Sequence, residues 1–524
     1  MIGVSLPLAC LEKSDLLFAE LWDRGVRSVE LQGVSLSTEP ESVASHAAEL
    51  SKYGFQIVID LTPFDVSASP SEVLAPLSRL WAGIQQKRLP VVIHVTHGTE
   101  MSHLRNLAEY AQQNAYPILF LLSDETGGLG SGLESLLTLT EAIDRQNVAI
   151  CLDIDQHASV EQKEQLAVRF GEKARQKHMA YIRLHGGSDE DGKEIFAYPL
   201  QAYLTEFCHK YFGVYNITLD SLGEEKLDRE KNELWAAVDQ VKSVMPLCAK
   251  LYDDLREHFD SRFMHALSMF DGSKKGTHFA LIQSSSFLFC SDGFRWGMDV
   301  AFRGAYRLAK TPKQAATLLA DLDLMIISHG HSDHFEERTV RALAQNPTQW
   351  IIPDFLAEEA LSRGIAREKM ITARVGETIR VGPLSICPFL GKHFRPFTGK
   401  GIDEYGYHIS VENGPSMAFP VDTRDFSLRD IPNLPKADYC FANVWLGDSC
   451  GNATDHGERL AEFARFMLHF SEKNILFAHL YECDRKEKDM WRDEHAELLA
   501  DTIHQINSET CTIIPHSGEI YELG

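Results

Sequence analysis

Short apolar runs alternate with longer amphipathic segments along the first 225 residues of the chain. The runs are rich in β-branched residues and have the length of strands, whereas the segments between them repeat apolar residues at helical spacing. Eight strand candidates follow from this pattern: residues 4–6, 26–31, 57–61, 91–95, 118–122, 148–153, 181–185 and 215–220. The alternation predicts an α/β domain folded as a parallel (β/α)8 barrel, the TIM barrel.

The pattern changes after residue 225. Residues 224–269 are strongly charged, with Leu234, Val238 and Val241 at helical spacing. A small, polar, glycine-bearing stretch at 271–276 follows and is typical of a domain boundary. We therefore predict the barrel over 1–225, a helical connector with the last barrel helices over 226–272, and a second domain over 273–524.

A polar loop dominates the second domain. It follows the apolar run 321–327 and contains His329, His331, Asp333 and His334 within six positions. Imidazole and carboxylate groups at this density are typical of Zn, Mn or Fe sites. The alternative is a solvated polar loop, or a histidine cluster without metal.

Three further metal-ligand types occur downstream, each at the end of a strand-like segment. His393 comes after the run 384–390, Asp422 directly follows 417–421, and His479 directly follows 474–478. A site for two metal ions needs more ligands than one loop supplies, and these residues are the candidates.

The order His-x-His-x-Asp-His, His, Asp, His resembles the metallo-β-lactamase fold superfamily, and Asp299 in the segment 297–302 resembles that family's early aspartate. The resemblance implies an αββα domain and two divalent metal ions. It implies the following roles: His329, His331 and His393 on one ion, Asp333, His334 and His479 on the other, Asp422 between them, and Asp299 orienting a ligand. The segments 421–423 and 478–481 resemble the ascorbate-6-phosphate lactonase-like branch.

The chemistry implied by this resemblance is hydrolysis by a metal-bound hydroxide, because coordination brings the pKa of water to about 7. Asp333 and His334 are the expected catalytic residues. Zinc is the first choice of metal, with manganese or iron as alternatives. The absence of a glutamate at the second ligand position argues against the oxygen-reducing diiron branch. Weaker candidates are Tyr405, His408, Asp455 and His456, and Arg395 for an anionic substrate group.

The first half resembles the xylose isomerase-like barrel superfamily. The matching segments are 25–31, Leu152-Asp153 and His185-Gly186-Gly187. The resemblance implies a divalent metal in the barrel, with Asp153 and His185 as ligands on the sixth and seventh strands. Asp220 and a residue at the end of the fifth strand, Glu125 with Ser123 and Asp124 as alternatives, would complete the set, although Asp220 stands where the family has glutamate. The alternative is a barrel without catalytic activity, since a fold does not imply a function.

Composition limits the partners and the compartment. The chain has 524 residues and a net charge of −24, without a run of basic residues, so we expect no nucleic acid partner. The ten cysteines are scattered, which favours reduced thiols in the cytoplasm. The first seven residues read as a strand rather than a signal peptide, and no run is long enough to span a membrane.

Three hypotheses follow. The chain is a metal-dependent hydrolase of a small anionic metabolite, such as a sugar-phosphate lactone or a phosphate ester. It is a bifunctional enzyme, with a barrel that isomerises or epimerises a sugar-like compound. Or the barrel is a non-catalytic platform for substrate binding or homo-oligomerisation, and only the C-terminal half is an enzyme.

Overall fold

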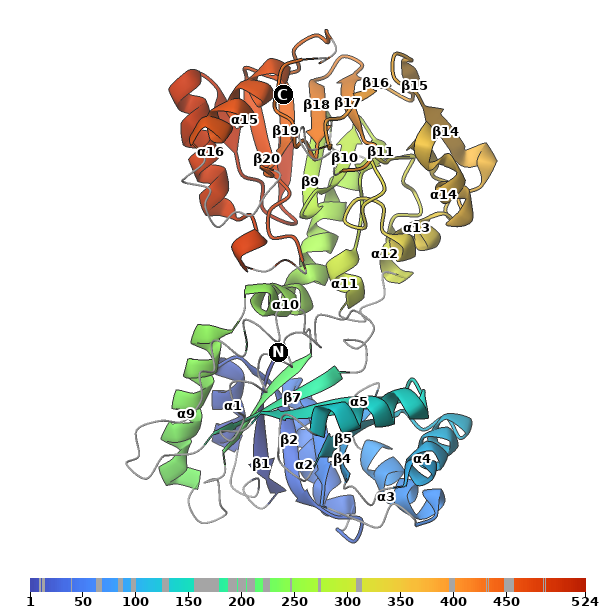
Figure 1. Cartoon of the computed structure of the whole chain (residues 1–524), viewed down its shortest axis with the longest axis vertical. Helices are drawn as coiled ribbons and strands as arrows, with labels where there is room; N and C mark the ends of the chain where they lie inside the picture. The colour runs from blue at the N-terminus through green and yellow to red at the C-terminus, as the bar shows by residue number, and fades with distance from the viewer. Residues whose placement is uncertain are drawn as a thin grey trace. The chain divides into compact units, whose positions relative to one another are not determined.

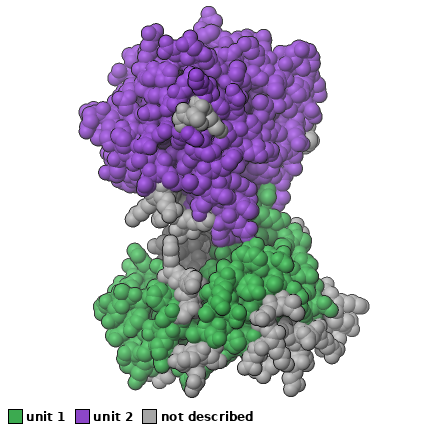
Figure 2. All heavy atoms as spheres, turned by 180° about the vertical axis from the view of Figure 1, so that it is seen from behind, with its two compact units in different colours: residues 1–250 green, residues 251–524 purple. Residues whose placement is uncertain are grey.

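The computed structural model forms two compact units, residues 1–250 and 251–524, which Figure 2 colours separately. The structure describes residues 1–8, 11, 15–38, 40–62, 68–82, 88–95, 100–124, 132–154, 179–186, 196, 204, 213–219, 227–245, 247–271, 275–307, 313–394, 401–429, 431, 433–446, 457–483, 485 and 487–524. Within these residues no helix combines the length and the apolar character needed to cross a membrane.

The first unit is a closed barrel of eight parallel strands, as predicted (Figure 1). Its strands are β1 (Ile2–Pro7), β2 (Val26–Val34), β3 (Gln56–Leu61), β4 (Leu89–Val95), β5 (Ile118–Asp124), β6 (Val148–Ile154), β7 (Met179–Gly186) and β8 (Val214–Leu219). The first strand also pairs with the last, Ile2 opposite Tyr215, which closes the barrel. Among the residues that the structure describes, its helices are α1 (Asp15–Asp23), α2 (Pro40–Tyr53), α3 (Pro70–Ala82), α4 (Met101–Gln113), α5 (Gly132–Ile143) and α9 (Leu227–Val244).

Alternate residues of the barrel strands face opposite sides, because side chains alternate along a strand. One set packs against the helices in a large core that includes Ile57, Ile59 and Val91. The other set forms a separate interior cluster: Val58, Val92, Leu121, Ala149, Cys151, Tyr181 and Val214.

The second unit contains two seven-stranded sheets. The first sheet has the order β14 (Met370–Ala373), β13 (Gln349–Pro353), β12 (Leu324–Ile326), β11 (Phe294–Met298), β10 (Ser286–Ser291), β9 (Thr277–Gln283) and β22 (Ile520–Leu523). The second has the order β15 (Ile379–Val381), β16 (Leu384–Leu390), β17 (Tyr405–Val411), β18 (Ser416–Val421), β19 (Tyr439–Asn443), β20 (Asn474–Ala478) and β21 (Cys511–Ile513). Its helices are α10 (Leu247–Leu267), which begins in the first unit, α11 (Arg303–Arg307), α12 (Lys313–Leu318), α13 (Glu337–Leu343), α14 (Ala357–Ser362), α15 (Gly457–Phe470) and α16 (Asp493–Ile506).

An aromatic core joins the two sheets. Phe289 stacks on Trp296 within the first sheet, and Phe279 and Phe287 meet Phe441 of the second sheet edge to face. The other face of β18–β20 packs against α15 and α16 (Figure 1). Two face-to-face sheets with helices outside agree with the predicted architecture, and they bring the ends of strands from both sheets to one place.

The division between the compact units falls within α10, between Lys250 and Leu251. The segment predicted as a connector, 226–272, contains α9 and α10. The boundary predicted at 272/273 therefore lies 22 residues beyond this division (272 − 250).

Candidate metal centre

The loop after β12 and three strand ends of the second sheet supply the predicted metal ligands. His329 to His334 follow β12, His393 follows β16, Asp422 follows β18 and His479 follows β20. Seven side chains form two groups of four that share one carboxylate: His329, His331, His393 and Asp422, and Asp333, His334, His479 and Asp422. In each group the candidate ligand atoms all lie within 4.8 Å of one another.

The first group is built around His331. Its Nδ1 lies 3.2 Å from Nε2 of His329 and 3.1 Å from Nε2 of His393. Oδ2 of Asp422 lies 3.8 Å from Nε2 of His329. Burial lowers the pKa of all three imidazoles, that of His393 to about 4, so the rings are neutral and have lone pairs to offer a cation.

The second group combines two imidazoles with two carboxylates. Oδ2 of Asp422 lies 3.4 Å from Nε2 of His334 and 3.6 Å from Nε2 of His479. Asp333 Oδ2 lies 3.2 Å from Nε2 of His479. Although burial opposes it, the neighbouring carboxylates raise the pKa of both imidazoles, with Asp422 as the main favourable cause.

These spacings fit metal coordination. Ligands of a tetrahedral ion at about 2.0–2.1 Å lie about 3.3 Å from one another, close to the separations found in both groups. In addition, Asp333 and Asp422 have no lysine or arginine ion pair among the described residues. Their charge is therefore left for histidines or for a cation, and the donor set suits a divalent ion.

Asp299 holds the ligand loop from behind. Its Oδ2 lies 2.8 Å from Nδ1 of His334, and its two oxygens accept hydrogen bonds from the Ser328 backbone N–H and hydroxyl at 2.8 and 2.6 Å. A carboxylate on the far nitrogen of a ligand histidine fixes the ring and its tautomer. Asp299 therefore lies at hydrogen-bond distance from a candidate ligand, and the orienting role implied by the sequence resemblance stays a prediction.

Backbone strain is concentrated at this site. Asp299, Val421 and His479 adopt positive φ angles of 49°, 56° and 63°. A left-handed conformation is uncommon for any residue with a Cβ and is an outlier for a β-branched one. Such strain typically occurs where surrounding contacts hold functional groups in place, and here it occurs where β18 leads into Asp422 and where β20 leads into His479.

Glu404 is a buried acid that sequence reasoning missed. Its Oε2 accepts a hydrogen bond from the Asp422 backbone N–H at 3.0 Å and lies 3.5 Å from Nδ1 of His329. Burial raises its pKa well above the usual value, and Oε1 has no hydrogen-bond partner among the described residues. No sequence signal marks Glu404, because the residues it contacts are 18 and 75 positions away (422 − 404 and 404 − 329).

Two arginines and a tryptophan border the centre. The Trp445 ring lies 5.9 Å from that of His479, and the guanidinium groups of Arg424 and Arg485 lie 5.5 and 4.8 Å from the Trp445 centroid. The charge of Arg424 reaches His331 and His393, since it lowers the pKa of both. Arg485 also pairs with the buried Glu482 at 2.7 Å.

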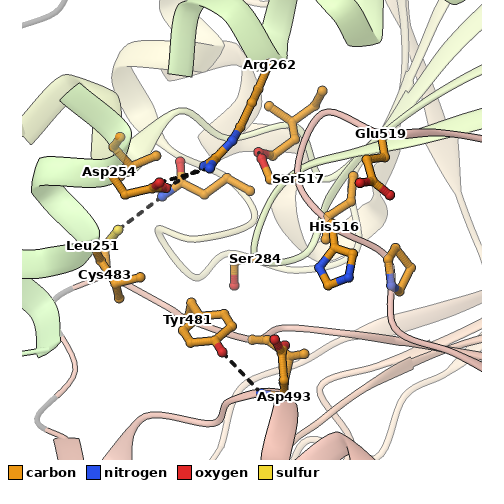
Figure 3. A pocket seen from close by; sticks show the side chains of 16 residues that line it. Leu251, Asp254, Arg262, Ser284, Tyr481, Cys483, Asp493, His516, Ser517 and Glu519 are labelled. Atoms are coloured by element: carbon orange, nitrogen blue, oxygen red, sulfur yellow. Dashed lines mark hydrogen bonds and ion pairs between the residues drawn. The ribbon is translucent and has the colours of Figure 1, made fainter. Parts of the chain in front are cut away.

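A cavity of about 460 Å³ adjoins the segment that contains His479. Ser284 and Tyr481 line it (Figure 3), and both adopt positive φ angles. The Ser284 carbonyl accepts a hydrogen bond from the His479 N–H at 2.9 Å, while the next residue, Ser285, lies 3.4 Å from Nε2 of His334. The cavity and the metal centre are therefore next to each other along the Ser284–Ser285 backbone.

The structure describes two of the four barrel residues predicted from the sequence as metal ligands. Asp153 and His185 lie on β6 and β7, and Oδ1 of the aspartate is 2.8 Å from Nε2 of the histidine. Glu125 and Asp220 lie outside the described residues, as do Arg395, Asp455 and His456. Of the weaker candidates, Tyr405 donates a hydrogen bond to Asp354, and His408 lies buried in β17.

Residues 295–474 match the family model described as beta-lactamase superfamily domain. A curated relative, a UPF0173 metal-dependent hydrolase of Roseiflexus castenholzii, is 31% identical over 110 residues, which span 20% of this chain and 43% of the relative. The chain thus matches less than half the length of that relative.

Solved structures resemble each half. The metallo-beta-lactamase fold protein YhfI from Bacillus subtilis is 16% identical, with a TM-score of 0.34, over 47% of this chain and 99% of its own. A xylose isomerase domain protein from Planctomyces limnophilus is also 16% identical, with a TM-score of 0.31, over 46% of this chain and 95% of its own.

Proposed function

We propose that the C-terminal unit is a metal-dependent hydrolase that uses two divalent ions held by the seven side chains of the two groups. The observation that carries this proposal is the pair of four-residue groups sharing Asp422, at spacings that suit metal ligands. The match of residues 295–474 to the beta-lactamase superfamily domain and the metal-dependent hydrolase among the relatives support it. Zinc is the first choice of metal, and manganese or iron are the alternatives.

When bound, divalent ions supply Lewis acidity, which activates water and polarises the bond to be cleaved. The side chains of the protein would bind the ions and hold them in position. Asp422 belongs to both groups, so it would be a ligand that the two ions have in common. His331 and Asp333 are the partly exposed ligands, so substrate reaches the centre on their side, and Asp333 and His334 are the catalytic candidates of the second group.

The substrate we propose is a small anionic metabolite, such as a sugar-phosphate lactone or a phosphate ester. Arg424 and Arg485 support this choice, because they stand beside Trp445 next to the centre. A planar guanidinium suits phosphate and carboxylate groups. Nucleic acid is not the proposed substrate, since the chain has a net charge of −24.

For the barrel we propose an isomerase or epimerase activity, which would make the chain bifunctional. The proximity of Asp153 and His185 supports this proposal. The alternative is a platform for substrate binding or homo-oligomerisation.

Metal analysis of the intact protein, combined with hydrolysis assays, tests the hydrolase proposal. We expect about two ions per chain in the C-terminal unit and hydrolysis of a phosphate ester such as bis-p-nitrophenyl phosphate, or of a sugar-phosphate lactone. His331→Ala leaves the first group incomplete, so it should abolish turnover while the circular dichroism spectrum stays unchanged. The matched control is His103→Gln, on α4 of the barrel. Turnover near the wild-type rate by metal-saturated His331→Ala would refute the two-ion mechanism.

A further inference from the structure

The barrel interior contains a polar layer above its apolar cluster. Side chains two positions apart on a strand face the same way. The residues two or four positions after each member of the interior cluster therefore also face the interior, and they form the polar layer. Its members are Asp60, His94, Ser123, Asp153, Arg183, His185, Asn216 and Thr218. The layer lies toward the carboxyl ends of the strands, which is where barrel enzymes bind their substrates.

Arg183 lies at the centre of this layer. Its guanidinium forms ion pairs with Glu30 Oε2 at 3.0 Å, Asp60 Oδ1 at 2.9 Å and Asp153 Oδ1 at 3.6 Å, and its side chain is only 4% exposed. The three carboxylates come from β2, β3 and β6. The single delocalised positive charge of Arg183 therefore faces three carboxylates. A cluster of carboxylates like this one usually binds a divalent ion.

Two histidine–aspartate pairs lie on either side of the guanidinium. His94 Nε2 is 2.7 Å from Asp60 Oδ1, and His185 Nε2 is 2.8 Å from Asp153 Oδ1. The two rings are 19% and 28% exposed, so they can reach a ligand, whereas Arg183 cannot. A carboxylate that holds an imidazole in this way orients it and stabilises its protonated form.

The described residues of the barrel do not fit the metal that the sequence resemblance implied. Both oxygens of Asp153 are engaged, Oδ1 with His185 and Arg183 and Oδ2 with the Ser123 hydroxyl at 2.5 Å. Nε2 of His185 faces Asp153 at hydrogen-bond distance. A cation between them would also meet the positive charge of Arg183. Among described residues, both groups with metal-ligand spacing lie in the second unit.

We propose that the barrel is a second active site that works without a metal ion, in which Arg183 neutralises the acids in place of a metal and the pairs His94–Asp60 and His185–Asp153 transfer protons on a small neutral α-hydroxycarbonyl compound. The charge of the site favours a neutral substrate. With Glu30, Asp60 and Asp153 ionised, Arg183 and two imidazolium rings would only cancel the negative charge, so these residues offer an anion no net attraction.

The reaction that suits this arrangement is isomerisation through an enediol. One imidazole starts neutral and removes the proton from the carbon that carries the hydroxyl. The C–H electron pair becomes the C=C bond, and the carbonyl π pair moves to the oxygen, which takes a proton from the other, protonated imidazole. The first ring then returns its proton to the former carbonyl carbon while the second ring takes the proton of the other hydroxyl. The carbonyl has moved by one carbon, both rings are restored, and no oxidant or reductant is needed.

Hydrogen exchange at carbon tests the proposal with the full-length chain. The protein is treated with a chelator, and deuterium incorporation into dihydroxyacetone and D-fructose in D2O is followed by NMR. We expect incorporation to continue without metal. His94→Gln should slow it at least about 100-fold, since a positioned acid or base typically contributes 10²–10⁴-fold. Asp60→Asn should slow it as well, because the ring loses its orienting carboxylate, whereas His103→Gln should not change it.

Three outcomes would overturn the proposal. These are incorporation that stops on chelation and returns with Mn²⁺, His94→Gln with wild-type incorporation, or no incorporation into either probe by the wild-type protein. His94 lies at the partly exposed edge of the polar layer, so its variant keeps the test informative even if substitutions of the buried Arg183 prevent folding.

Discussion

The barrel and the C-terminal unit both gather aspartates and histidines at strand ends, but they neutralise the acids differently. In the barrel, the Arg183 guanidinium pairs with Glu30, Asp60 and Asp153. In the C-terminal unit, the ion-pair partners of Asp333 and Asp422 among the described residues are all histidines, and Asn443 donates a neutral hydrogen bond to Asp422 at 2.7 Å. The first cluster carries its own cation, whereas the second depends on protons or on an ion from solution.

The distances between neighbouring side chains also differ between the barrel and the C-terminal groups. His94 and His185 lie 2.7 and 2.8 Å from their aspartates, which are hydrogen-bond distances. In the C-terminal groups, His331, His393 and His479 lie 3.1–3.2 Å from neighbouring ligand atoms, a separation at the upper end of the hydrogen-bond range and close to that of two ligands on one ion. Residue types alone therefore do not distinguish a candidate metal site from a charge network. The presence of an internal cation does.

Removing the shared carboxylate should have the largest effect. Asp422→Asn weakens both groups at once, so we expect both ions to be lost and hydrolysis to fall by at least about 10³-fold. Metal analysis and turnover measure this, with the exposed Asp321→Asn as control. Two tightly bound ions in the variant would contradict the role of Asp422 in both groups.

Removing the internal cation should destabilise the barrel. Arg183→Met leaves three buried or half-buried acids without their cation, and breaking such a buried pair costs about 3–5 kcal/mol. Urea unfolding of the full chain should show this loss in the transition of the barrel, while the metal content of the C-terminal unit stays unchanged. Arg183→Lys should recover part of the stability. If chelation of the wild type destabilised the barrel equally, the guanidinium would not be its only cation.

Glu404 should influence the metal centre through hydrogen bonding rather than through charge. Glu404→Ala leaves the Asp422 N–H without its acceptor, and losses at such supporting positions typically weaken metal affinity about 10–100-fold. Glu404→Gln keeps an acceptor oxygen and should retain most of the affinity, which competition with a chromogenic chelator measures. The exposed Glu412→Ala is the control. Equal losses in the Ala and Gln variants would show that the negative charge matters instead.

The smallest effect we predict concerns substrate recognition. Arg424→Ala should raise KM for an anionic substrate about 10–100-fold with little change in kcat, because a hydrogen bond to a charged group contributes about 1.5–3 kcal/mol. The exposed Arg429→Ala should leave KM unchanged. A fall in kcat at constant KM would place Arg424 in the chemical step rather than in binding.

The chain sequence by itself determined the two-part architecture, because strand and helix periodicity are local properties. It also placed chemically reactive residues, such as His329, His331 and Asp153, just after or near the ends of apolar runs. The local pattern shows which strand ends carry such residues. In a parallel barrel these ends meet at one face, so the residues are expected to lie near one another.

Only the tertiary structure decided which charges meet. Arg183 lies 153 residues from Glu30 and 123 from Asp60 (183 − 60), and no pattern along the chain marks it as the centre of the barrel. Glu404 likewise meets Asp422 and His329 only through the pairing of strands and loops. Electrostatic interactions depend on distance and burial in space rather than on position in sequence, so the assignment of each acid to an arginine or to a candidate metal group had to come from the fold.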